Sequence, residues 1–83
     1  MTWDVDFTQQ VLADRVGLEP QVNEAITDVL LVWLKAGPPR GNARDLAGMT
    51  VYEERVAIKY LLGYVINDER RRFALLWLRQ VPA

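Results

Sequence analysis

The chain has 83 residues, a formal net charge of −1, 51% hydrophobic residues and 25% charged residues. This length and composition predict one folded domain that spans residues 1–83. It contains neither Cys nor His, which excludes disulfides, thiolate metal sites and histidine acid–base chemistry, so we expect no metal and no cofactor. We also expect no signal peptide and no membrane span. The absence of Cys is typical of a cytoplasmic protein.

The charges are unevenly distributed along the chain. Residues 1–36 carry six acids and two bases, whereas residues 37–83 carry eight bases and five acids. Such an asymmetry is found both in proteins with a basic face for an anionic partner and by chance in short chains with solvated surfaces.

The first segment predicts a strand followed by a short helix. Aromatic and β-branched residues alternate with aspartates over Trp3–Phe7, the period-two pattern of a half-buried strand. Thr8 stands where a helix N-cap belongs, and Gly17 is expected to end the helix in the left-handed conformation. We expect the inner face of this helix to be formed by Leu12, Ala13 and Val16.

A long helix and a loop are predicted next. Pro20 suits the first turn of a helix, and apolar residues then recur at spacings of three and four up to about Lys35. Gly37-Pro38-Pro39 ends this helix. Residues 37–50 are expected to form a loop from which Leu46 and Met49 reach into the core.

The last third of the chain fits either strands or helices. As strands, it would comprise Tyr52–Val56, Ile58–Ile66 and Phe73–Gln80, with Ile58–Ile66 in the centre because it is apolar on both faces. As helices, it would begin with a capping box formed by Thr50 and Glu53. The pattern alone leaves open an α+β domain or an all-α bundle.

Several side chains of this stretch could contact an anionic partner. The run Arg70–Arg72 could bind phosphates, although a solvated turn is its commoner role. Trp77 could stack on a base, but we expect it in the core. Glu53 and Glu54 are expected to be exposed carboxylates. Tyr60 and Tyr64 share one strand face and are expected to pack in the core or an interface.

Four short segments carry a resemblance to a known family. They are Trp3–Phe7, the loop motif Leu46-Ala47-Gly48, the segment Tyr52–Val56, and the segment Tyr60–Glu69 with tyrosines at its first and fifth positions. In this order they resemble the opening strand, the Leu-x-Gly loop, the Tyr/Trp-x-x-Arg-Val strand and the Tyr-Arg-x-x-Tyr-x-x-x-Asp strand of the RelE/ParE superfamily of type II toxins. The resemblance favours the α+β fold, with an antiparallel sheet of about four strands and two N-terminal helices on one face.

The resemblance implies a toxin of a type II toxin–antitoxin system that a cognate antitoxin neutralises. RelE-like toxins cut mRNA in the ribosomal A site with basic residues, and ParE-like toxins inhibit DNA gyrase. The resemblance therefore implies an mRNA endonuclease that acts with the ribosome, with gyrase inhibition as an alternative. A homodimer is a further option.

Carried over to this sequence, the resemblance implies catalytic roles for Arg55, Lys59 and Arg79. We further predict that Arg44, Arg70, Arg71 and Arg72 contact RNA. The chain also departs from the family. Leu61 replaces the usual Arg, and Glu53 occupies a place that is basic in the nucleases. We expect no C-terminal helix with a catalytic Tyr after Arg79. An inactive homologue and a non-enzymatic protein–protein interaction module therefore stay open as alternatives.

Overall fold

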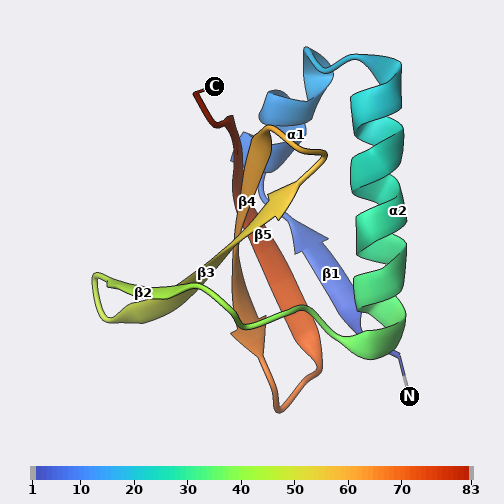
Figure 1. Ribbon diagram of the computed structural model, residues 1–83. Coiled ribbons are helices and arrows are strands. Elements are labelled where there is room, and N and C mark those ends of the chain that lie inside the picture. Colours follow the sequence, from blue (N-terminus) through green and yellow to red (C-terminus); the bar gives the residue numbers. More distant parts are fainter. Residues whose placement is uncertain (1, 83) are drawn as a thin grey trace.

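The computed structural model describes residues 2–82 and shows an α+β domain in which two helices pack against a mixed sheet (Figure 1). The elements are β1 (Asp4–Phe7), α1 (Gln9–Val16), α2 (Pro20–Ala36), β2 (Ala43–Leu46), β3 (Met49–Val56), β4 (Tyr60–Asn67) and β5 (Arg72–Gln80). The strand order is β1-β5-β4-β3-β2. The predicted fold class is confirmed, and the all-α alternative is wrong.

The central position of the long apolar strand is confirmed. β4 lies in the middle of the sheet and pairs antiparallel with β3 and β5. The β4–β5 ladder runs from Tyr60 opposite Gln80 to Asn67 opposite Arg72, with a register shift between Gly63 and Tyr64. One pairing was not expected, because β1 lies parallel to β5 and makes the sheet mixed.

A fifth strand lies where the sequence predicted a loop. β2 pairs antiparallel with β3, and the resulting hairpin extends away from the helices (Figure 1). Its turn residues Ala47 and Gly48 both have positive φ, of 51° and 82°, which is the requirement of a tight two-residue hairpin turn. Leu46 and Met49 are exposed rather than anchored in the core. Every residue of β2 is exposed, so this strand has no buried face and no period-two hydrophobic signal.

Helix α1 begins as predicted but presents a different face to the sheet. The Thr8 hydroxyl accepts a hydrogen bond from the Val11 backbone N–H at 3.4 Å, as an N-cap does. Val11 is fully buried, whereas Leu12 and Val16 are exposed. The predicted inner face is therefore wrong. Gly17 also lies outside the left-handed region, with φ of −91°.

The reason for this orientation is the short length of β1. Beyond Phe7, β5 has no strand partner on that side, and α1 lies along it instead. The Thr8 hydroxyl donates to the Leu75 carbonyl at 2.8 Å, and the Asp14 carboxylate accepts from the Leu78 N–H at 3.0 Å. Polar side chains thus satisfy the backbone of β5, as buried backbone groups require.

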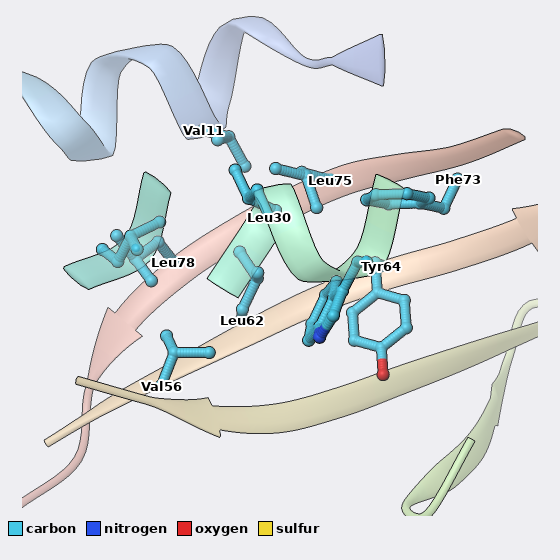
Figure 2. Packing of buried hydrophobic residues seen from close by; sticks show 10 residues of the cluster. Val11, Leu30, Val56, Leu62, Tyr64, Phe73, Leu75 and Leu78 are labelled. Atoms are coloured by element: carbon cyan, nitrogen blue, oxygen red, sulfur yellow. The ribbon is translucent and has the colours of Figure 1, made fainter. Parts of the chain in front are cut away.

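Helix α2 closes the hydrophobic core over the same face of the sheet. Ile26, Leu30 and Trp33 are its buried residues. Figure 2 shows side chains from both helices and from β3, β4 and β5 meeting in one cluster. The Trp33 ring lies 4.9 Å from the Tyr64 ring and 5.9 Å from the Phe73 ring, measured between centroids. These aromatic contacts attach the helix to the two strands that form the centre of the sheet. Within residues 2–82, no helix has the length and hydropathy needed to cross a membrane.

The Tyr64 hydroxyl is expected to make the free energy of unfolding fall as the pH rises in the alkaline range. It is fully buried and donates to the Pro39 carbonyl. Burial, together with the nearby negative charge of Glu54, raises the pKa of Tyr64 above that of an ordinary tyrosine. The folded state therefore holds this proton more tightly than the unfolded chain, whose tyrosines titrate near pH ~10. The resulting stability is fully present below that pH and is lost as pH rises through the folded pKa.

We expect Tyr64→Phe to remove this alkaline loss. At pH 7 the variant should be less stable by about 1 kcal/mol, because the Pro39 carbonyl loses its partner. Above pH ~10 the difference from the wild type should shrink. Urea unfolding across this range measures both effects. A constant difference at every pH would contradict the expectation.

Candidate functional site: the open face of the sheet

Within residues 2–82, one face of the sheet is not covered by helices, and several predicted site residues project from it. Val56, Leu62 and Tyr64 belong to the core beneath the helices. Because successive side chains of a strand point to opposite faces, Arg55 and Gly63 lie on the other face. We call this second surface the open face.

Arg55 and Arg79 lie in one row across three strands of the open face. Leu61 of β4 pairs with Arg55 of β3 on one side and with Arg79 of β5 on the other. The two arginine backbones are thus separated by two strand spacings, about 10 Å. Lys59 precedes β4 directly in the β3–β4 turn and is exposed. The structure therefore brings the three predicted catalytic residues to the same end of the sheet.

The turn between β3 and β4 has a strained backbone. Ala57 and Ile58 have φ of 49° and 67°, a region that β-branched residues rarely adopt. The Arg55 guanidinium donates to the Ile58 carbonyl at 3.2 Å, and the Ile58 side chain is exposed. This hydrogen bond fixes the direction of the Arg55 side chain relative to the turn that carries Lys59.

A second row of the open face centres on a buried carboxylate. Glu53 of β3 is opposite Gly63 of β4, which is opposite Trp77 of β5. One Glu53 oxygen lies 3.2 Å from Nη2 of Arg44, and the other accepts from Nη2 of Arg79 and from the Trp77 indole, each at 3.3 Å. Glu53 is only 9% exposed.

Two expectations about this row are wrong. Glu53 was predicted to be exposed, but cations and the indole enclose it. Trp77 was predicted to lie in the core, but its indole lies over Gly63 on the open face and is half-buried. Gly63 is the signal that could have indicated this position, because a glycine inside a central strand often marks a close approach by another group.

The arginines of the β4–β5 turn form a separate group. Arg70 and Arg71 are exposed in this turn, and the β4–β5 turn lies at the opposite end of β4 from the β3–β4 turn (Figure 1). Arg72 binds the carboxylate of Asp6 through two hydrogen bonds of 3.1 and 2.5 Å and lies 3.6 Å from Asp4. The hydrogen bonds from Arg72 lower the pKa of Asp6. Eight residues of strand place the two groups about 23 Å apart.

The open face provides cations but few groups that transfer protons. Tyr52, Tyr60 and Tyr64 all pack with the core on the helix-covered face. Among the tyrosines and glutamates of β3 and β4, only Glu53 projects from the open face, and it is bound to Arg44, Arg79 and Trp77. The end near Lys59 thus holds three cations, and the Arg44 guanidinium adds a fourth at the neighbouring carboxylate of Glu53. It can stabilise negative charge at phosphate oxygens.

Comparisons with known proteins agree with the resemblance found in the sequence. No protein-family model and no curated protein matches the chain. A chain of the toxin–antitoxin complex RelBE2 from Mycobacterium tuberculosis is similar in structure, with a TM-score of 0.71, 24% identity, and coverage of 96% of this chain and 99% of that one. A mutant of the E. coli toxin RelE in the free state matches with a TM-score of 0.67, 25% identity, and coverage of 96% and 84%. The chain therefore has the fold of the RelE toxins, which confirms the resemblance to the RelE/ParE superfamily.

Proposed function

We propose that the protein is the toxin of a type II toxin–antitoxin system and contacts RNA with its open face. The observation that carries this proposal is the convergence of Arg55, Lys59 and Arg79 at one end of that face, on a RelE fold. Arg44 adds a fourth cation beside them. One structural neighbour is a toxin–antitoxin complex, which supports a cognate antitoxin as the partner. This activity would take place in the cytoplasm, on mRNA in the ribosome.

The proposed reaction is cleavage of mRNA by its own ribose. The 2′-oxygen forms a bond to the adjacent phosphorus, and the bond from phosphorus to the 5′-oxygen breaks. The 2′ proton passes to an acceptor, and the leaving 5′-oxygen takes up a proton from solvent. Arg55 and Arg79 flank the position where the phosphate gains charge, and Lys59 adds a third cation. Because Glu53 is bound to two arginines, the described open face provides electrostatic stabilisation without an unbound carboxylate base. The ribosome then supplies the remaining positioning and the proton acceptor.

Replacing both arginines of the first row is expected to abolish toxicity. Removing one preorganised donor to a developing oxyanion costs about 10²–10³ in rate, so Arg55→Ala together with Arg79→Ala should eliminate mRNA cleavage. Colony counts after induced expression in a bacterial host and primer extension on a reporter mRNA measure the effect.

Lys35→Ala is the control, because Lys35 is exposed in the last turn of α2, away from the row. This variant should remain fully toxic. Growth arrest that persists in the double arginine variant would refute the assignment of the row. Arrest with intact mRNA and altered plasmid supercoiling would instead indicate a ParE-like action on gyrase.

The ion pairs of Glu53 favour a second function, an inactive homologue that only binds partners. Arg44 and Arg79 are both neutralised in part by this carboxylate, which reduces the charge available to a phosphorane. Under this alternative, wild-type expression causes neither growth arrest nor mRNA cleavage, although the protein still binds its antitoxin.

A further inference from the structure

Glu53 connects two cations whose backbones lie far apart. Arg44 on β2 is opposite Val51 of β3, whereas Arg79 on β5 is in the row of Arg55. The two backbones are therefore offset by three strand spacings across the sheet, about 14 Å, and by four residues, about 13 Å, along it. Their guanidinium groups nevertheless lie within 3.2 and 3.3 Å of the same carboxylate. Since β2 belongs to the protruding hairpin and is exposed at every residue, the contact with Glu53 is what directs Arg44 toward the centre of the open face.

Exposure differs sharply between the carboxylate and the cations. The side chain of Glu53 is 12% exposed, whereas those of Arg44 and Arg79 are 53% and 57% exposed. Each arginine contacts the carboxylate through Nη2, and a guanidinium has five N–H donors. Most donors of both arginines therefore remain available to a ligand above the sheet. The Trp77 indole N–H donates a third contact to the carboxylate, at 3.3 Å.

A ligand phosphate would not replace this carboxylate. Leaving a buried charge without its partners is strongly unfavourable, and Glu53 is far less exposed than the two arginines that contact it. An arriving anion therefore meets a pair of arginines that are already oriented. Such preorganisation reduces the loss of side-chain freedom on binding.

We propose that Glu53 is a positioning residue. It holds the guanidinium groups of Arg44 and Arg79 so that both bind one phosphate of single-stranded RNA. This inference rests on the proposed function and adds a residue that acts through two others. It assigns Arg44 and Arg79 to a phosphate beside the reacting one, so that Arg79, with its five N–H donors, contacts both. Glu53 stands where the family pattern has a basic residue. It thus contributes to RNA binding by fixing the orientation of Arg44 and Arg79.

The proposal predicts that neutralising Glu53 weakens RNA binding, which is the opposite of what its charge alone would do. Glu53→Gln removes a negative charge, so long-range electrostatics alone would strengthen RNA binding. Loss of positioning should instead weaken binding about tenfold, as expected for losing one charge-assisted contact. The slope of log affinity against log salt should also decrease in magnitude by about 0.7, the contribution of one phosphate contact in single-stranded RNA. Fluorescence anisotropy with a labelled oligouridine and the full chain measures both quantities.

A matched variant and a change of background isolate the positioning role. Glu54→Gln makes the same charge change on the next residue, which faces the helices, and should leave affinity unchanged or slightly higher. In a background that lacks both Arg44 and Arg79, Glu53→Gln has nothing left to position, so its effect should reverse and binding should tighten. Glu53→Asp keeps the carboxylate and should recover part of the affinity. Thermal unfolding of each variant confirms that it is folded.

Two results would overturn the proposal. One is unchanged or tighter binding by Glu53→Gln in the wild-type background, and the other is absence of oligouridine binding by the wild-type protein. Growth arrest on expression is read separately and tests the proposed function. A protein that binds RNA in a Glu53-dependent way without arresting growth would retain this inference and lose the toxin assignment.

Discussion

Replacing Trp33 with alanine is expected to lower the free energy of unfolding by about 3–5 kcal/mol, the cost of deleting a large buried aromatic side chain. Trp33 is the residue of α2 that contacts both Tyr64 of β4 and Phe73 of β5. A domain of this length has a total stability of about 4–12 kcal/mol, so the variant should be largely unfolded or unfold near ambient temperature. Circular dichroism during heating measures the change.

Leu31 supplies the control for this prediction. It lies two residues earlier on the same helix but is 53% exposed, and Leu31→Ala should change stability by no more than about 0.5 kcal/mol. Trp33→Phe keeps an aromatic ring and should cost less than Trp33→Ala. If Leu31→Ala and Trp33→Ala shift the unfolding temperature equally, the assignment of the core face of α2 is incorrect.

The parts of the fold that could be predicted have strong local patterns. β1 follows from its alternation, and α2 follows from its spacing between Pro20 and Gly37. The identity of β4 as the central strand follows from apolar residues on both of its faces. The choice between strands and helices in this region needed the family resemblance, because the residues of β4 and β5 satisfy both patterns.

The parts that failed depend on tertiary contacts. The inner face of α1 is set by hydrogen bonds from Thr8 and Asp14 to the backbone of β5, and no periodicity records these bonds. β2 lacks a buried face. Its pairing is decided by the turn at Ala47 and Gly48, where a non-glycine residue with positive φ is difficult to foresee.

The candidate site, like the fold, could be predicted only in part. Arg55 and Arg79 were predicted through the family resemblance, but their shared neighbour Leu61 is known only from the strand register. The role of Glu53 was missed for a different reason. Its partners Arg44, Trp77 and Arg79 lie on two other strands, so its burial results from side chains that are distant in the sequence.

Gly63 links the stability of the sheet to the arrangement of the site. A Cβ atom at this position would lie 2.3 Å from Cε2 and 2.6 Å from Nε1 of Trp77, so Gly63→Ala must displace the indole. We expect a loss of about 1–3 kcal/mol in stability, the usual cost of overpacking. The same displacement separates the indole from Glu53 and should weaken RNA binding. Gly17→Ala is the control, because a Cβ there meets no atom within 4 Å.

A double-mutant cycle with Trp77→Ala tests this cause directly. Removing the indole frees the space above Gly63, so Gly63→Ala should cost little stability in the Trp77→Ala background. The two substitutions should therefore be coupled by about 0.5–3 kcal/mol, as expected for residues in direct contact. Urea unfolding of the four proteins provides the coupling energy. An additive result would show that the cost of a side chain at position 63 arises from the β4 backbone itself. In that case Trp77 would not be the reason for glycine in the central strand.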